Sequence, residues 1–345
     1  MKRTYDPARR VVKGMGDYLL RMSRYTVMCP PALLLVLVLA TPRPSQAQGL
    51  PEYAPLNPVA ASRSGLYFQP FREPETGSWR HEVTLDYASV IEYNRLDQAD
   101  YVLDSEVLRL SFAASRDIGR RTFLALSASI GGAYAGFLDG FLDWYHGKLG
   151  IRVSEREQRP QDRFTYSITL PDGRAVSRAR RDLFLGDVRA GLGIRVTSQL
   201  QTLLSVTLPT STGPEGYGRG APSAAVLNTL RVQLTPRLIY EGSLGVGVTP
   251  AHGRLADLQN TAMLAVSSGL RHRIWGNQSV FGNLFYHSPY YHDTTLPALD
   301  RRELSLDVGW ILQSRGGGEW RAGLTEDLEP GGPGVDLVFR VGRTF

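Results

Sequence analysis

Two groups of histidines and aspartates have a spacing that permits chemistry. Asp139, Asp143 and His146 follow one another at i, i+4 and i+7, which places them on one stripe of a helix. Two carboxylates and an imidazole so arranged are able to bind a metal ion or to act as acid and base. They are more common as an ordinary solvated helix face, so we expect no metal site.

His287, His292 and Asp293 form the second group, beside Tyr290 and Tyr291. An aspartate–histidine pair is able to activate a water molecule for hydrolysis. Histidines in such a connection are more often hydrogen-bonded loop residues, and the glycine-rich stretch 213–220 lacks the lysine of a phosphate-binding loop. We therefore expect no catalytic residues and no cofactor, and keep a hydrolase as an alternative.

A third set consists of charged residues. They occupy the polar positions of segments in which polar and apolar residues alternate. The stretch from Val188 to Val196 shows the pattern, with Arg189 and Arg195 on the polar phase. Period-two alternation predicts strands with one apolar and one polar face. The charged residues that we expect to line the interior of a sheet closed on itself are Arg80, Glu82, Asp86, Arg109, Arg189, Arg195, Arg231, Glu241, Glu303, Asp307, Asp336 and Arg340.

About twelve segments of the chain alternate in this way. Most are longer than the ~5–6 residues of strands in soluble sheets and close to the ~9–11 residues that cross a membrane as a tilted strand. The predicted strands are 79–94, 101–115, 121–133, 186–197, 200–208, 224–235, 237–249, 258–271, 278–287, 302–314, 318–327 and 334–345.

The connections between these segments are of two kinds. Those at 116–120, 198–199, 235–237, 275–277 and 315–317 are short, whereas those at 134–185, 209–223, 250–257 and 288–301 are longer. Short periplasmic turns, long outer loops and an even strand number are typical of outer-membrane barrels. We predict an all-β fold, an up-and-down antiparallel transmembrane β-barrel of about 12 strands over residues 79–345, with 48–78 on the periplasmic side. A soluble β-sandwich or propeller is the alternative.

Aromatic residues gather near the predicted strand ends. Trp79, Trp275, Trp320 and Phe345 fall at the periplasmic rim, and the opposite rim has Tyr93, Tyr101, Tyr286, Tyr290 and Tyr291. Two such girdles are expected at the membrane interfaces. A last strand that ends in Phe345 also resembles the signal that the barrel-insertion machinery reads, so we expect that machinery and outer-membrane lipid as partners.

Residues 1–47 predict a secretory signal peptide. Basic residues precede the apolar run 33–40, and Ser45 and Ala47 supply the small side chains of a cleavage site. The run is too short to span a bilayer as a helix. We expect translation to start at Met15 or Met22 and cleavage near Ala47, which directs the chain to the bacterial outer membrane; a single N-terminal anchor is the alternative.

This predicted signal carries the whole formal net charge of +6, because the other residues hold equal numbers of basic and acidic side chains. Without an excess of positive charge the mature chain is not expected to bind nucleic acid. Cys29, the only cysteine, also lies in the signal, which excludes a disulfide framework and a thiolate metal site.

The long connection 134–185 is expected to have structure of its own. Apolar residues from Leu138 to Leu149 recur at helical spacing and predict a short amphipathic helix. Residues 165–170 and 174–177 flank a Pro-Asp-Gly turn and predict a hairpin. We expect the helix either to plug or gate the barrel mouth or to rest at its rim or at the lipopolysaccharide boundary. The candidate gate residues are Asp139, Phe141, Asp143, Trp144 and His146.

Five sequence blocks together resemble the domain-of-unknown-function 3187 family of Gram-negative bacteria. They are GLP through PLNP at 49–58, FLDGFLDWYHG at 137–147, LGD at 185–187, LPTSTG at 208–213 and EDL at 326–328. The chain departs from the family pattern in the Ser-Thr of the fourth block and in the proline- and glycine-rich stretch 330–334. The resemblance implies an outer-membrane-type barrel of uncharacterised role and supplies no catalytic residues.

The sequence thus favours a passive role. A barrel of about twelve strands lies between side-chain-filled small barrels and open porins. We expect a narrow, mildly anion-favouring conduit for small solutes, or a structural barrel component in which the charges only pair. The alternatives are a surface hydrolase of the omptin or phospholipase type and an adhesin or binding platform built on the outer loops.

Overall fold

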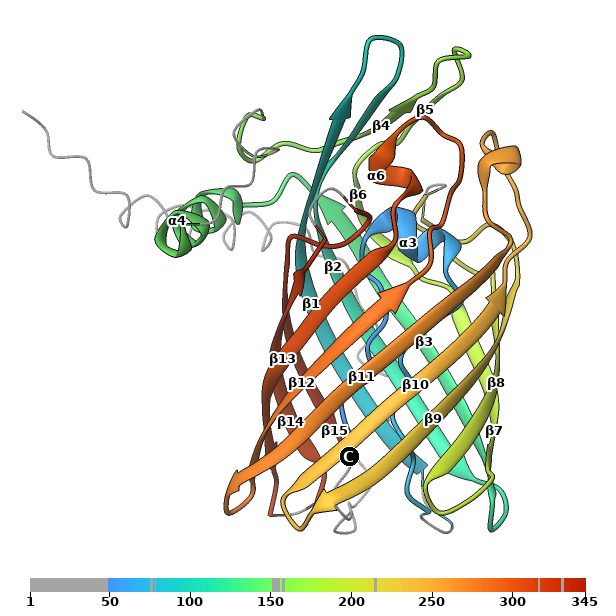
Figure 1. The fold of residues 1–345 in the computed structure, drawn as a ribbon, viewed down its shortest axis with the longest axis vertical. Coiled ribbons are helices and arrows are strands. Elements are labelled where there is room, and N and C mark those ends of the chain that lie inside the picture. The colour runs from blue at the N-terminus through green and yellow to red at the C-terminus, as the bar shows by residue number, and fades with distance from the viewer. Residues whose placement is uncertain are drawn as a thin grey trace, which may run out of the picture. The chain divides into compact units, whose positions relative to one another are not determined.

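A computed structural model of the chain describes residues 49–345 except 75–76, 78, 151–155, 157–158, 214–215, 316 and 330–331. In this part of the chain twelve antiparallel strands form a closed barrel, which β1 and β15 complete (Figure 1). In order around the barrel the strands are β1 (Trp79–Arg95), β2 (Asp100–Asp117), β3 (Thr122–Tyr134), β7 (Val188–Arg195), β8 (Leu200–Leu208), β9 (Ser223–Thr235), β10 (Leu238–Val248), β11 (Ala262–Trp275), β12 (Gln278–His287), β13 (Glu303–Gln313), β14 (Glu319–Asp327) and β15 (Leu337–Thr344). The predicted fold class is confirmed.

The remaining elements lie in the connections and in the segment before β1. They are α3 (Pro58–Arg63), α4 (Asp139–Leu149), β4 (Thr165–Thr169), β5 (Ala175–Ser177), β6 (Arg181–Leu185), η1 (Ala256–Leu258) and α6 (Pro297–Asp300). The predicted hairpin of the long connection is confirmed, because β4 pairs with β5 and extends the sheet beyond β2. No helix within the described ranges is long and apolar enough to cross a membrane.

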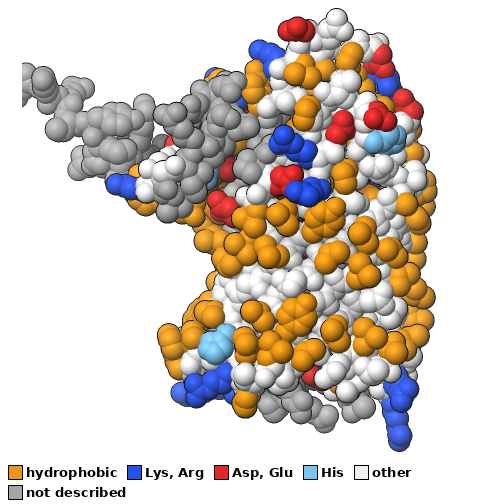
Figure 2. Space-filling view, viewed as in Figure 1, with side chains coloured by type: hydrophobic (Ala, Val, Ile, Leu, Met, Phe, Trp, Pro, Cys, Tyr) orange, Lys and Arg blue, Asp and Glu red, His pale blue; other side chains and the backbone are white. Residues whose placement is uncertain are grey.

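Strand alternation sorts the side chains between the two faces of the barrel. On β7 Leu192 and Ile194 are exposed, whereas Arg195 is buried. Similar exposed apolar side chains occur on the other barrel strands except β2, and Figure 2 shows apolar side chains spread over the wall with charged side chains toward its two ends. An outward apolar band of this kind is what a lipid-facing barrel wall requires.

The predicted bounds of one strand and the predicted place of two tyrosines differ from the structure. The segment predicted at 258–271 is β11 at Ala262–Trp275, because Arg271 points inward and forms an ion pair there instead of ending the strand. Tyr101 and Tyr290, predicted at a lipid-facing rim, are fully buried within the molecule. Trp79, Trp275 and Trp320 are exposed at the short-turn end, as expected of interfacial aromatics.

Residues 49–74, here called the inner segment, run inside the barrel (Figure 1). The segment starts beside β10 and β11, where Leu50 N–H donates to Glu241, reaches the long-loop end at α3, and returns to Asp117 at the short-turn end of β2 through Arg72. Tyr53 and Phe68 join its two arms as a bridge. The prediction of a periplasmic-side segment at 48–78 was wrong for these residues, because their hydrogen-bond partners are inward-facing strand residues.

The inner segment packs toward one side of the barrel. Its Leu66 lies against β10 at Gly245 and Gly247, where added Cβ atoms would come within 3.3 Å and 3.0 Å of a Leu66 methyl group. On β11, a Cβ at Gly269 would lie 2.5 Å from Leu50 Cδ1. Glycine at these inward positions allows the close approach, so the β10–β11 side of the interior is filled.

Candidate functional site

Alternating charges cross the inner wall from β13 to β2. Arg340 on β15 donates to Asp307 at 3.0 Å and to Asp86 at 2.7 Å, and Arg109 on β2 donates to the other oxygen of Asp86 at 3.0 Å. Arg109 also donates to the carbonyl oxygens of Ala54 and Pro55 in the inner segment. The row therefore both pairs its own charges and holds the inner segment.

A second row of charges lies nearer the short-turn end. Arg321 on β14 donates to Glu82 at 3.0 Å and to Glu319 at 3.3 Å. Arg271 donates to Glu319 at 2.8 Å and to the Gly49 carbonyl at 3.0 Å. Buried charges require such partners, because an unpaired one carries a large desolvation cost.

The turn of the inner segment is fastened at the long-loop end. Asn57 caps α3 by accepting from Val59 N–H and donates to the Gly334 carbonyl at 2.7 Å. The buried Arg63 donates to the carbonyl oxygens of Thr249, Pro250 and Asn260. These contacts tie α3 to the loops that follow β10 and β14.

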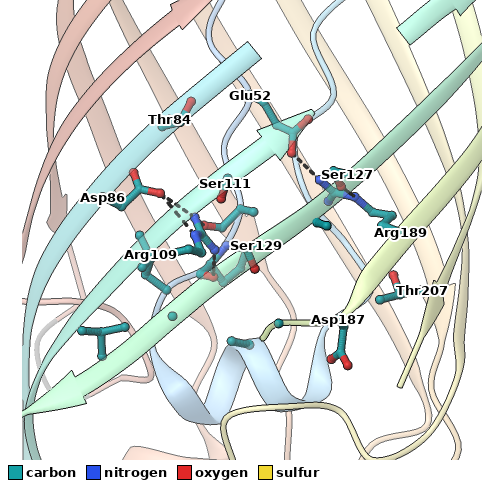
Figure 3. A pocket seen from close by; sticks show the side chains of 18 of the residues that line it. Glu52, Thr84, Asp86, Arg109, Ser111, Ser127, Ser129, Asp187, Arg189 and Thr207 are labelled. Carbon is teal, nitrogen blue, oxygen red and sulfur yellow. Dashed lines mark hydrogen bonds and ion pairs between the residues drawn. The ribbon is translucent and has the colours of Figure 1, made fainter. Parts of the chain in front are cut away.

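A cavity of about 170 Å³ lies between the inner segment and the wall formed by β1, β2, β3, β7 and β8 (Figure 3). It exists because the inward positions of β2 and β3 hold small side chains, whereas the opposite side of the barrel is filled. These small lining residues are Ser111, Ala113, Ser127, Ser129 and Gly131. Serine hydroxyls make this wall polar and able to exchange hydrogen bonds with a solute.

A second cavity, of about 70 Å³, continues toward the short-turn end. Glu52, Glu82 and Arg189 line both cavities. Glu52 of the inner segment and Arg189 of β7 form an ion pair at this common boundary, and Figure 3 shows the two side chains pointing toward each other. The Arg189 guanidinium also lies 3.5 Å from the centre of the Tyr67 ring. The pair therefore lies at the boundary between the two cavities, which is called the constriction below.

The lining charges of the larger cavity are balanced. Arg109, Arg189 and Arg340 have the carboxylate partners described above, and Arg219 pairs with Asp187 at 3.4 Å near the long-loop end. Burial lowers the pKa of Arg219 to about 10, so the group remains a cation near neutral pH. Because each of these arginines has a carboxylate partner, the cavity is polar without an excess of positive charge.

Most of the charged residues predicted to face the interior do contact one another or the inner segment. Besides the two rows, Arg195 bonds to Asp117, Glu241 accepts from Leu50 N–H, and Arg231 lies 3.7 Å from Glu241. Glu303 accepts hydrogen bonds from Tyr53 and Tyr290, and Arg80 lines the smaller cavity.

Asp336 does not lie with the interior charges. It precedes β15, and its carboxylate bonds to Arg156, which also donates to Ser89 at 2.7 Å and to Asp139 at 2.6 Å. Ser89 has the outward parity of Tyr87 on β1. The prediction of a lumen position for Asp336 was therefore wrong, because the strand alternation that predicts it has not yet begun at this residue.

The predicted gate helix is α4, and it does not enter the barrel. Leu138 and Leu142 pack on Leu337, with Tyr87 and Phe339 beside them on the outside of the wall. Figure 1 shows α4 outside the barrel. The gate role assigned to Asp139, Phe141, Asp143, Trp144 and His146 is corrected, since their apolar neighbours lie on the outer wall. The alternative position, at the boundary of the barrel, describes α4 better.

The members of each histidine group differ in burial. Asp139 and His146 are buried, whereas Asp143 is exposed, and the described residues contain no group of three potential metal ligands placed to hold an ion. His287 is buried and bonds to Ser64 Oγ at 2.8 Å, while its other ring nitrogen meets the Ser288 carbonyl at 2.6 Å. His292 is exposed. His287 therefore fastens the inner segment to β12.

The fold and its interior define the class of protein, an outer-membrane β-barrel with an internal segment. The chain belongs to the family described as protein of unknown function (DUF3187), whose family model matches residues 36–328. The family resemblance drawn from the sequence blocks is thereby confirmed. Each of the five blocks contributes a residue or helix near the long-loop end, namely Asn57, α4, Asp187, Ser211 and Glu326.

Solved structures with a similar fold are outer-membrane barrels. The COG4313 outer membrane channel from Pseudomonas putida F1 is 12% identical with a TM-score of 0.51, and the match covers 79% of this chain and 96% of that chain. The NanC porin is 7% identical with a TM-score of 0.46, covering 77% of this chain and 98% of that one. No curated protein matches the sequence. At 12% identity, the similarity to the COG4313 channel concerns the fold alone.

Two features of this site are not predicted from the sequence. One is the inner segment with Glu52 and Arg63, and the other is Arg219, which lies in a loop without alternation. A usable signal was present for the cavity, because the polar phase of β2 and β3 consists largely of serine, alanine and glycine. Small residues on one side of a closed sheet indicate unfilled space there.

Proposed function

We propose that the protein is an outer-membrane conduit for small polar solutes, in which the inner segment controls passage. The observation that carries the proposal is the pair of cavities between the inner segment and the β1–β2–β3–β7 wall, divided by the Glu52–Arg189 ion pair. Polar, convergent side chains in an enclosed space are typical of solute sites. The balanced charges favour small polar solutes over a general preference for anions.

The similarity in fold to the COG4313 outer membrane channel supports the same proposal. We propose further that residues 1–47 act as a cleaved export signal, with cleavage near Ala47. Phe345 at the end of the last strand would be read by the barrel-insertion machinery, and outer-membrane lipid would surround the apolar wall.

A disulfide lock provides the test. A Cβ at Gly65 of the inner segment would lie 3.0 Å from Cβ of Ser223 on β9, close to the ~3.5–4.5 Å of a disulfide. The sole natural cysteine, Cys29, precedes the described residues and is replaced by serine in the test protein. We expect Gly65→Cys with Ser223→Cys to show solute-dependent openings in planar bilayers when reduced and to lose them when oxidised.

The single variants Gly65→Cys and Ser223→Cys serve as controls, since neither forms the lock and both should keep the openings under oxidising conditions. Equal conductance of the oxidised and reduced double variant would contradict control by the inner segment. A complete absence of conductance, also in a folded variant lacking residues 49–74, would rule out the conduit itself.

A further inference from the structure

Helix α4 lies on the outer wall of the barrel with one side packed and one side uncovered. Leu138 and Leu142 face the wall at Leu337, and Phe141 contacts Phe339 with ring centroids 5.9 Å apart. The opposite side presents Trp144, which is 58% exposed, and the preceding turn presents Phe137, which is 46% exposed. Trp144 is thus directed away from the wall, whereas Phe137 stacks on Tyr87 of β1 with ring centroids 5.4 Å apart.

The contacts also fix how α4 is rotated on the wall. β15 runs from the long-loop end to the short-turn end, so Phe339 lies closer to the short-turn end than Leu337 does. Phe141 is therefore on the edge of the helix that faces the short-turn end. Asp143 is on the other edge and accepts a hydrogen bond from Gln161 at 2.5 Å. One edge of α4 is aromatic and faces the apolar wall region, and the other is polar.

Buried polar contacts hold α4 in this position. Arg156 bridges Asp139 at the start of the helix to Asp336 before β15. His146 at its end lies 3.7 Å from Asp336 and 3.8 Å from Glu326. The helix is thus attached to the wall by ion pairs. These contacts do not involve its aromatic edge, which is available to contact the membrane.

The aromatic edge of α4 continues the apolar surface of the strands beneath it. Phe339 has the outward parity of Val341, and it pairs with Leu324 on β14; both Val341 and Leu324 are exposed on the wall. That wall faces lipid in an outer-membrane barrel. Aromatic residues at the edge of such a wall prefer the interface between acyl chains and headgroups.

We propose that α4 is an interfacial membrane helix, and that Phe141 and Trp144 insert among the acyl chains of the outer leaflet while Asp143 stays in water. An amphipathic helix with aromatic residues on one edge and a charge on the other has the composition of helices that lie in a membrane surface. The helix so placed is a lipid contact beyond the strands of the barrel. The proposal does not depend on the conduit function.

Site-directed spin labelling tests this placement. In a Cys29→Ser background, a nitroxide is attached to Trp144→Cys in one variant and to Asp143→Cys in another, and each folded protein is placed in phospholipid vesicles. Oxygen concentrates in acyl chains, whereas a nickel chelate stays in water. We expect the ratio of oxygen to nickel accessibility to be several-fold higher at position 144 than at position 143.

A second measurement uses the unlabelled protein, so that a label that disturbs α4 does not decide the outcome. Vesicles with brominated acyl chains should quench the fluorescence that Trp144 contributes, obtained as the difference between the wild type and Trp144→Phe. High nickel accessibility at position 144, or shielding from both reagents by another protein copy, would overturn the proposal. Unquenched Trp144 fluorescence would overturn it equally.

Discussion

At the scale of single residues, the interior of the barrel is a set of compensated charges. Arg340 lies between Asp86 and Asp307, and Arg109 shares Asp86 while it holds the backbone of the inner segment. Removing one member of such a buried pair leaves the other charge without a partner. Each of these charged side chains is therefore held by partners on other strands, some adjacent, as Asp86 and Arg109 are, and some not, as Asp307 and Arg340 are.

The Glu52–Arg189 pair sets the charge at the constriction. Glu52→Gln leaves the arginine uncompensated, and we expect selectivity for anions; Arg189→Gln should favour cations. Screened Coulomb interaction with one charge changes the energy of a passing ion by on the order of 1 kcal/mol, or about fivefold in the permeability ratio. Reversal potentials in asymmetric potassium chloride measure the change. Arg237→Gln, in an exposed turn, is the control, and equal reversal potentials in all variants would contradict this constriction.

At the scale of elements, the sequence predicts the strands well and the inner segment poorly. Alternation is a local signal, so residues such as Leu192 and Arg195 reveal their strand and its faces without knowledge of any partner. The inner segment has no such period, and its partners are distant in sequence: Leu50 bonds to Glu241 and Tyr53 to Glu303. The interior charges were predictable for the same reason that the strands were, whereas their pairing depends on contacts between residues that are distant in sequence.

The turn of the inner segment at α3 offers a direct test of its attachment. Arg63→Ala removes hydrogen bonds to the carbonyl oxygens of Thr249, Pro250 and Asn260. Hydrogen bonds to a charged group contribute about 1.5–3 kcal/mol, so we expect the ratio of released to docked segment to rise roughly ten- to a hundredfold. Open probability in single-channel recordings measures this rise.

The matched control for that variant is Arg254→Ala. Arg254 is exposed in the loop that contains the carbonyl partners of Arg63, and it bonds to Ala175 instead of the inner segment. Its open probability should equal that of the wild type. An unchanged open probability in Arg63→Ala would show that α3 is not the attachment that limits opening.

At the scale of the whole molecule, the barrel combines an apolar wall, a nearly filled interior and an outer end where loops, α3 and the sheet extension meet. The C-terminal residue takes part in closing the wall, since Phe345 N–H donates to the His81 carbonyl at 2.9 Å. Its ring lies 4.6 Å from the Arg343 guanidinium. The end of the chain therefore lies beside the junction of β1 and β15.

Changing this residue should affect insertion more than stability. We expect Phe345→Ala to lower the fraction of protein assembled in the outer membrane several-fold, because its backbone contacts remain while the aromatic ring is lost. The shift in gel mobility between heated and unheated samples measures that fraction. Phe345→Tyr keeps an aromatic end and should assemble normally. Equal assembly of Phe345→Ala and the wild type would argue against recognition through this ring.

The junction of β1 and β15 joins the two ends of the barrel, with Tyr87 opposite Phe339, and the inner segment lies directly before β1. The inner segment is folded back on itself, with α3 at the turn. Such a segment docks more easily on an open sheet that is still curving than inside a barrel that has already closed. We therefore expect docking of residues 49–74 to precede closure of the junction during assembly. In this order the inner segment acts as a template for the curvature of the sheet. The time at which β1 pairs with β15 then decides whether the finished barrel contains the inner segment.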